Sequence, residues 1–339
     1  MSNKSLAALS ALLCRTPGKF FQKLAMIGNI LFHDWRLRPI DPGCLPEHVG
    51  DFRKFYSFVD SPDFNRLDDR SRSAVRCFLE LLRMSDVFNT HCYFYNYSKI
   101  FIPFSKKDRK RQEAKKKQFC SKYGLPKTLE LSSCCFSHGM DLLSDNITKY
   151  IEGKTIIDAG AFVGDSALSL IPYSPGKILS FEPSEKVFRE LQANHERIQE
   201  LKEKCIIFRQ ALGDSAEDLC FADTADSGAH ADKAGSSTVR QTTVDDVISG
   251  MKDPVGLIKA DIEGMALKMI LGARQTILRD RPILTIAVYH CPDEMFGIPE
   301  VIQSWGLKYI YRYEFLEPEL YREMTLIAYP AELNEPGER

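Results

Sequence analysis

From residue 155 onward the sequence alternates between short β-rich runs and helical runs, and this alternation restricts the fold more than any other feature. The β-rich runs are TIID, KILSFEP, KCIIFRQA, VGLIKADIEG and PILTIAVYH, and the main helical runs between them are DSALSLI, SEKVFRELQANHERI and MALKMILGARQTIL. Repeated βα units place parallel strands side by side and cover both faces of the sheet with helices. The sequence therefore predicts a doubly wound α/β domain with a mostly parallel sheet.

The two ends of the chain depart from this alternation. LKYIYRYEF and REMTLIAY are strand-like runs joined by the turn-forming LEPELY, which predicts a C-terminal hairpin with an antiparallel last strand. Before about residue 150 the pattern is mostly helical, and RSRSAVRCFLELLRM places Val75, Phe78, Leu79 and Leu82 on one helix face. The predicted organisation is a helical N-terminal domain over residues 1–139, a ligand-binding α/β domain over 140–330 and a tail over 331–339.

The charge balance argues against nucleic acid as a partner. The 339 residues carry a formal net charge of only -1, so no overall field would gather a polyanion. The basic run at residues 105–118 is the exception, and a phosphate-contacting helix remains open there. Because Asp108 and Glu113 interrupt it, a solvated helix face or connector is favoured.

Cysteine usage and hydropathy favour a cytoplasmic protein. The ten cysteines form no CxxC pair, and Cys77, Cys205 and Cys220 lie in apolar runs where reduced thiols fill a core. Residues 6–14 resemble a short signal core, but no small-x-small cleavage site follows them. The run is also far too short to span a membrane, so we expect no membrane span.

The turn AGAFVG after the first predicted strand indicates a ligand site. The strand ends at Asp158, Gly160 and Gly164 allow close backbone approach, and the next helix begins near Asp165. A dinucleotide fingerprint needs an early glycine where this chain has Ala159. Asp165 in the first helical turn would also repel a phosphate. The turn therefore favours a cationic or zwitterionic ligand.

S-adenosylmethionine meets this requirement, because it has an amino-acid end and a sulfonium but no phosphate. Asp158 and the loop amides are suited to its ammonium and carboxylate ends. Glu182 follows at the tip of the second strand, where a carboxylate accepts both ribose hydroxyls. We therefore expect S-adenosylmethionine as the cofactor.

The chain resembles the FkbM-type methyltransferases of the class I, Rossmann-like fold. The likeness rests on IDAGAFVGDSAL, FEPSEKVFRELQANH, QALGD, TTVDDV and IKADIEGMALKMILGA, which together span about residues 155–290. It implies an S-adenosylmethionine-dependent methyltransferase that acts on a hydroxyl of a saccharide or small metabolite. The chain departs from the family pattern at Ala266 and Leu267, which are apolar, and around Arg312.

The resemblance assigns roles along the cofactor. It implies that the glycine turn lines the methionine end, that Glu182 binds the ribose and that residues 210–212 lie beside the adenine. The acidic pair Asp261 and Glu263 matches the end of the fourth strand. The expected cofactor-binding residues are Asp158, Gly160, Ala161, Phe162, Gly164, Asp165, Glu182, Pro183, Gln210, Ala211, Leu212 and Asp261.

Transfer of a methyl group to a hydroxyl also requires a proton acceptor. His290 is the expected general base, because an imidazole titrates near neutral pH, and Asp261 and Glu263 are expected beside it. Ordinary alternatives remain open: a loop hydrogen bond for the histidine and helix capping for the acids. A metal-assisted version is conceivable, but neither these residues nor Cys134-Cys135 with His138 have metal-ligand spacing, so no metal is expected.

Aromatic packing and two other functional classes also remain open. Phe162, Tyr289, Trp305 and Tyr311 are suited to a wall near the sulfonium, although sheet packing explains them equally well. A nicotinamide-dependent dehydrogenase uses the same fold class, but it requires phosphate at the turn. A methyltransferase-fold module without catalysis, which associates with proteins through its N-terminal half, is the third hypothesis.

Overall fold

The computed structural model describes residues 37–39, 59–76, 78, 92–94, 106–222, 230–231, 237–316 and 324–334. The signal-like run at 6–14, Cys77, Leu79 and Leu82 lie outside the described residues. Two three-residue strands, β1 (Leu37–Pro39) and β2 (Cys92–Phe94), pair antiparallel in the N-terminal part. None of the described helices is long and apolar enough to cross a membrane.

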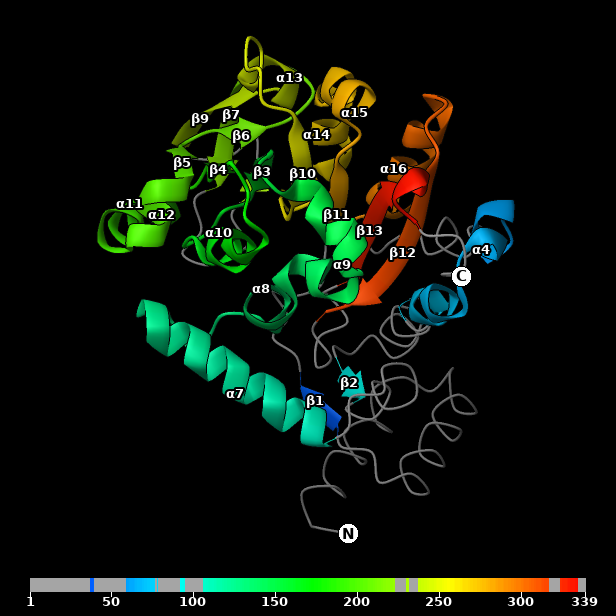
Figure 1. Cartoon of the computed structure of the whole chain (residues 1–339), viewed down its shortest axis with the longest axis horizontal. Helices are drawn as coiled ribbons and strands as arrows, with labels where there is room; N and C mark the ends of the chain where they lie inside the picture. Colours follow the sequence, from blue (N-terminus) through cyan, green and yellow to red (C-terminus); the bar gives the residue numbers. More distant parts are fainter. Residues whose placement is uncertain are drawn as a thin grey trace, which may run out of the picture.

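The centre of the molecule is a seven-stranded sheet in the order β12-β13-β11-β10-β3-β4-β5 (Figure 1). Its strands are β3 (Thr155–Ala159), β4 (Lys177–Phe181), β5 (Cys205–Phe208), β10 (Val255–Ala260), β11 (Ile283–Ala287), β12 (Tyr309–Phe315) and β13 (Met324–Pro330). Strand β13 is antiparallel to both of its neighbours, and the pairs from β11 to β5 are parallel. The predicted mostly parallel sheet with a C-terminal antiparallel hairpin is confirmed.

The strand order places a crevice at the centre of the sheet. Strand β3 is the first strand of this sheet along the chain. Strands β4 and β5 follow on one side of β3, and β10 then pairs with the other side of β3. At such a switch point the connections after the two central strands diverge in opposite directions. The turn after β3 and the turn after β10 therefore border one opening at the carboxyl edge of the sheet.

Helices cover both faces of this sheet (Figure 1). They include α8 (Leu131–Phe136), α9 (Asp145–Thr148), α10 (Asp165–Leu170), α11 (Glu185–Arg197), α12 (Gln199–Lys204), α13 (Val244–Val247), α14 (Ala266–Gly272), α15 (Arg274–Asp280) and α16 (Pro292–Ser304). Helix α7 (Lys106–Tyr123) lies outside this layer and packs against α8. Successive strand residues point to opposite faces. Ile156 accordingly packs in the cluster with α8 and α10, and Ile157 packs in the cluster with α14 and α16.

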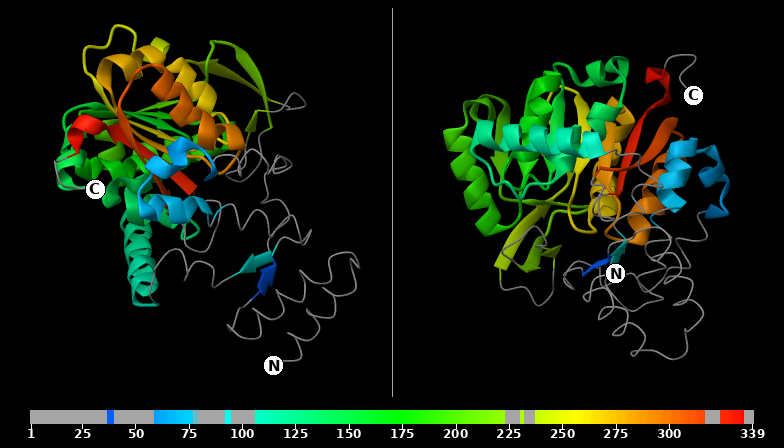
Figure 2. Two further views of the ribbon diagram at one scale, coloured as in Figure 1. Left: turned by 90° about the vertical axis from the view of Figure 1, so that its right-hand side faces the viewer. Right: turned by 90° about the horizontal axis from the view of Figure 1, so that it is seen from below.

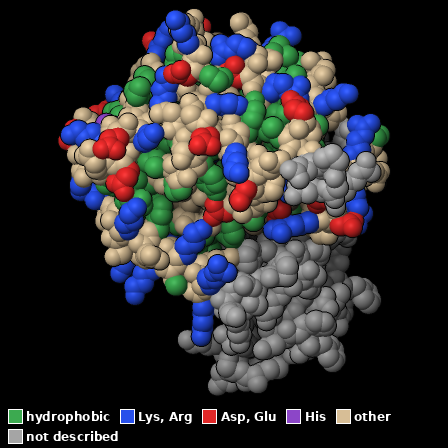
Figure 3. Space-filling view, in the orientation of Figure 1, with side chains coloured by type: hydrophobic (Ala, Val, Ile, Leu, Met, Phe, Trp, Pro, Cys, Tyr) green, Lys and Arg blue, Asp and Glu red, His purple; other side chains and the backbone are tan. Residues whose placement is uncertain are grey.

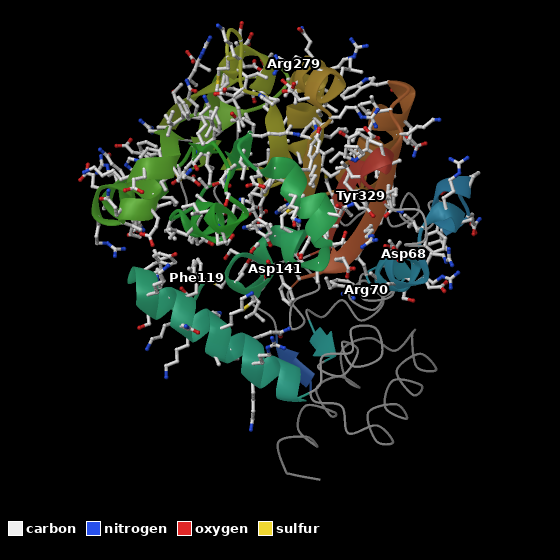
Figure 4. The ribbon with its side chains drawn as sticks, in the orientation of Figure 1. Asp68, Arg70, Phe119, Asp141, Arg279 and Tyr329 are labelled. Carbon is white, nitrogen blue, oxygen red and sulfur yellow. The ribbon has the colours of Figure 1, made fainter. Side chains whose placement is uncertain are left out.

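The described part of the N-terminal half joins these same clusters. Helix α4 (Pro62–Arg66) and the helical residues 69–76 lie beside edge strand β12, where Figure 4 labels Asp68 and Arg70. The Ser71 hydroxyl accepts a hydrogen bond from the backbone N–H of Tyr313 at 3.0 Å, and the Arg70 guanidinium lies 2.8 Å from the Glu314 carboxylate. This segment therefore covers the sheet edge, while the domain boundary at residue 139 stays a prediction.

A second, four-stranded sheet projects from the body between β5 and β10 (Figure 2). Its strands are β6 (Ala211–Leu212), β7 (Asp218–Ala222), β8 (His230–Ala231) and β9 (Ser237–Thr242). The strands β7, β8 and β9 fall in and around the polar stretch for which the sequence predicted no element. The Gln241 side-chain amide donates to Ser215 O at 3.0 Å and ties the base of this sheet together.

The basic run at 105–118 lies in α7, whose described side chains are mostly exposed. One of its lysines is anchored: the Lys115 ammonium donates to Cys135 O at 2.7 Å and lies 2.8 Å from the Asp141 carboxylate. Over the face shown in Figure 3, Lys and Arg side chains are interspersed with Asp and Glu side chains. This mixed surface agrees with the near-zero net charge.

Candidate active site

A cavity of about 460 Å³ opens at the carboxyl edge of the sheet, between the turns that follow β3, β4 and β10. Ten of the predicted site residues line it: Gly160, Phe162, Asp165, Glu182, Pro183, Gln210, Ala211, Leu212, Asp261 and Glu263. Asp158, Ala161, Gly164 and His290 were also predicted, but they are not among the lining residues. Tyr289 lines the cavity, whereas the predicted aromatic partners Trp305 and Tyr311 do not.

The glycine turn is shaped by its contact with the turn after β10. Gly160 has a φ of 76°, and a Cβ added there would lie 1.9 Å from the backbone oxygen of Asp261. Phe162 also has a left-handed φ, 46°, and its N–H donates to a Glu182 carboxylate oxygen at 3.1 Å. Such strained backbone persists when surrounding contacts hold it, and it often marks a functional site.

Asp158 lies beneath this turn and pairs with a lysine that sequence reasoning missed. Residues Lys259 and Asp158 are direct neighbours on the parallel strands β10 and β3, with 3.2 Å between ammonium and carboxylate. The Ser180 hydroxyl donates to the other Asp158 oxygen at 3.1 Å. Asp158 therefore supports the turn from below and is not among the lining residues, while its contact with the methionine end stays an untested prediction.

Lys259 is almost completely buried and remains charged. Its ammonium donates to Gly160 O at 2.6 Å and to Ala159 O at 3.2 Å. Burial lowers the pKa of the amine, but the nearby carboxylates, chiefly Asp158, outweigh burial and raise it. The sequence feature that could have predicted this ion pair is the lysine inside the apolar run VGLIKA, because a buried lysine needs a partner.

Glu182 is buried at the tip of β4 and faces the cavity. Its two carboxylate oxygens accept hydrogen bonds from the backbone N–H groups of Phe162, at 3.1 Å, and Ser184, at 3.0 Å. Burial raises its pKa to about 7, although the two amides favour the charged form. The carboxylate is thus held in one place and is ready to accept further hydrogen bonds from a ligand.

Asp165 supplies a second carboxylate on the same side. It opens α10, its side chain is 6% exposed, and its Oδ1 atom has no hydrogen-bond partner. Burial raises the pKa of this carboxyl. A buried acceptor without a donor costs free energy, so a cationic group bound in the cavity would relieve it.

His290 is surrounded by carboxylates at the opposite side of the site. Its Nε2 lies 3.4 Å from Glu263 and 3.6 Å from Asp261, and its Nδ1 lies 3.7 Å from the buried Glu294. Burial lowers the pKa of the imidazole, but Glu263, Glu294 and Asp261 together raise it well above 6.5. The three carboxylates therefore favour the protonated form of the ring, which would have no lone pair to accept a proton, and the role of general base stays a prediction.

Glu294, on α16, is a residue near His290 that the sequence analysis did not predict. One of its oxygens accepts a hydrogen bond from the Ala266 N–H at 2.7 Å, at the start of α14, and the other faces His290. Glu263 has a left-handed φ of 51°.

Within the described residues, no group of three or more His, Cys, Asp or Glu side chains is arranged to hold a metal ion. Cys134 and Cys135 are buried free thiols.

The cavity also has a wall that the sequence did not predict. Residues 128–138 contribute Glu130, Ser132, Ser133 and His138 to its lining, and Leu219 enters from β7. No motif marks this segment, and its position in the cavity depends on how it packs against α10.

The comparisons with known proteins agree with this fold. Residues 158–318 match the family model of the methyltransferase FkbM domain. The crystal structure of methyltransferase FkbM from Methylobacillus flagellatus KT matches with a TM-score of 0.50 and 17% identity, covering 82% of this chain and 59% of that one. This chain therefore spans about three fifths of that protein's length.

Another solved structure is more distant, and no curated protein matches the sequence. The O-methyltransferase from Bacillus cereus, solved in complex with SAH, is 14% identical with a TM-score of 0.41, covering 65% of this chain and 90% of that one. The matched segment, residues 158–318, contains the glycine turn, Glu182, Lys259 and the carboxylates around His290. Residues 158–318 therefore match the methyltransferase FkbM domain, and the fold is similar to that of a solved FkbM methyltransferase.

Proposed function

We propose that this protein is an S-adenosylmethionine-dependent methyltransferase that methylates a hydroxyl group of a saccharide or small metabolite. The observation that most supports this proposal is the cavity at the switch point of the sheet. Two adjacent turns place Glu182 and the unpartnered Oδ1 of Asp165 in its lining. The match of residues 158–318 to the methyltransferase FkbM domain supports the reaction class. The two carboxylates support the choice of ligand.

The residues of the cavity fit a nucleoside that carries a positive charge and no phosphate. Glu182 is suited to the two ribose hydroxyls, and Asp165 is suited to an ammonium group. The nearest buried cation, Lys259, directs its ammonium to Asp158 and to two backbone oxygens. With these bonds made, it has no further N–H to offer a pyrophosphate, which argues against the dehydrogenase hypothesis.

The proton of the acceptor hydroxyl is assigned to the acidic pair. Asp261 and Glu263 line the cavity and are partly exposed, so a hydroxyl entering beside them can donate to either carboxylate. S-adenosylmethionine, when bound, would supply a methyl group on a sulfonium and would leave as the thioether S-adenosylhomocysteine, while Asp261 and Glu263 would hold the acceptor hydroxyl and take its proton. In this proposal His290 acts as a positioning residue, because its positive charge fixes the orientation of both acids.

The same carboxylates limit the acceptor. An anionic group placed beside Asp261 and Glu263 would be repelled, whereas hydroxyl groups find hydrogen-bond acceptors there. The Tyr289 ring adds an apolar surface next to them. A neutral polyol or sugar therefore suits this side of the cavity better than a phosphorylated or carboxylated compound.

Calorimetry with S-adenosylhomocysteine tests the proposal directly. The Glu182→Gln variant should bind it about 10- to 100-fold more weakly than the wild type, because a charged acceptor for the ribose is lost. Glu190→Gln removes the same charge from an exposed position on α11 and should bind normally. Folded wild-type protein that does not bind S-adenosylhomocysteine, or that binds NAD more tightly, would refute the proposal.

A further inference from the structure

The wall formed by residues 128–138 lies outside the segment that matches the family model, and it ends 20 residues before that segment begins at residue 158. Helix α8 of this wall packs directly against α10, and Figure 1 shows the two side by side. Leu131 and Phe136 of α8 share a hydrophobic cluster with Leu168 of α10. The wall is therefore fixed relative to the glycine turn, and its polar groups face the cavity from a defined position.

His138 is a residue of this wall that contacts α10 directly. It lines the cavity, and its Nε2 lies 3.1 Å from the Ser166 hydroxyl in the first turn of α10. Burial, and to a lesser extent the charge of Lys259, lowers its pKa well below 6.5. The neutral ring has one donor nitrogen and one acceptor nitrogen, so it can relay a hydrogen bond between Ser166 and a ligand.

Asp165, the neighbour of Ser166 in α10, offers a hydrogen-bond acceptor to a ligand. Asp165 precedes Ser166 and presents the buried Oδ1 atom that lacks a hydrogen-bond donor. One carboxylate acceptor thus stands beside the hydrogen-bonded pair of His138 and Ser166, which are both neutral and which together keep one donor hydrogen for a ligand. An α-amino acid zwitterion has the complementary arrangement, with an ammonium and a carboxylate on the same carbon.

We propose that His138 and Ser166 bind the carboxylate, and Asp165 the ammonium, of the amino-acid end of the cofactor. This inference rests on the proposed function and adds to it a binding residue that lies outside the family segment. It also replaces Asp158, whose carboxylate is committed to Lys259 and Ser180, as the group that receives the ammonium.

The experiment compares two ligands by calorimetry. S-adenosylhomocysteine contains the amino-acid end, whereas 5′-methylthioadenosine has the same nucleoside and thioether without it. The wild type should prefer S-adenosylhomocysteine by about 10-fold or more, because of the charged hydrogen bonds at that end. His138→Asn should remove most of this preference while leaving the affinity for 5′-methylthioadenosine unchanged.

Asparagine is the appropriate replacement because His138 has a φ of 53°, which asparagine adopts with little strain. His195→Asn is the matched control: its ring lies on α11, 3.1 Å from Cys205 O and away from the cavity lining, and the preference should persist. Asp165→Asn tests the interaction with the ammonium group. It should weaken binding of S-adenosylhomocysteine and leave binding of 5′-methylthioadenosine unchanged.

The results separate this inference from the proposed function. Unchanged ligand preference in His138→Asn, or an equal loss of both ligands, would overturn the assignment of His138 while nucleoside binding by the wild type still stands. A wild-type protein that is folded and binds neither ligand would overturn the proposed function and this inference together.

Discussion

Lys259 and His290 are both buried basic side chains next to carboxylates, and they lie at the two sides of the cavity. Lys259 holds the glycine turn through Asp158 and two backbone oxygens, and His290 holds Asp261, Glu263 and Glu294. The sequence shows each residue type at its strand end. It does not show their partners, because these come from strands and helices that meet only in the folded sheet.

The pH dependence of stability tests the charge assigned to His290. A histidine whose folded pKa is raised contributes stability that is complete below about pH 6.5 and is lost as pH rises through the folded pKa. His290→Gln should therefore cost roughly 3 kcal/mol near pH 6, since three carboxylates lose their cation, and less at alkaline pH.

Thermal melting of wild type and His290→Gln between pH 6 and pH 10 measures this difference. The two curves should converge as pH rises, while His195→Gln, which removes an imidazole outside the cavity, should run parallel to the wild type. Parallel curves for His290→Gln would show that the imidazole is neutral throughout, and the role of general base would return.

Among the elements, the helices after β10 show where sequence patterns stop being sufficient. MALKMILGARQTIL predicted one helix, but the structure has α14 ending at Gly272 and α15 beginning at Arg274. A Cβ on Gly272 would lie 2.0 Å from Gly213 O, and the Asp245 carboxylate accepts from the Gln275 and Thr276 N–H groups. The break is therefore set by contacts from another segment, which periodicity does not reveal.

A comparison of substitutions at two glycines with positive φ distinguishes the cost of backbone strain from the cost of a steric clash. Gly160→Ala adds both the strain of its φ of 76° and a Cβ that would lie 1.9 Å from Asp261 O, so the turns after β3 and β10 must move apart. Gly153→Ala adds the strain of a φ of 71° alone, because nothing lies within 4 Å of its Cβ. The expected losses are about 3 kcal/mol or more for Gly160→Ala and about 1 kcal/mol for Gly153→Ala.

Urea denaturation of the two variants beside the wild type measures these losses. Gly160→Ala should also weaken binding of S-adenosylhomocysteine, and Gly153→Ala should not. Equal destabilisation by both substitutions would mean that the approach of the two turns is not tight, and the described shape of the cavity would be wrong.

Over the whole molecule, the α/β alternation predicted the parallel sheet, and the two C-terminal strand-like runs predicted its hairpin. The glycine turn, Glu182 and the resemblance to a known family predicted ten of the residues that line the cavity. These predictions worked because strand ends in a doubly wound sheet share one edge. The wall at 128–138 and the inward position of Glu294 escaped prediction, since packing between distant segments places them. Of the described N-terminal segments, residues 69–76 lie along β12 and residues 128–138 line the cavity.

The most direct test of the cofactor site is a crystal structure of the full chain with S-adenosylhomocysteine. The account predicts that both ribose hydroxyls donate to Glu182 and that the amino group lies on Oδ1 of Asp165. A nucleoside bound elsewhere, or a Glu182 carboxylate turned away from the ribose, would contradict it.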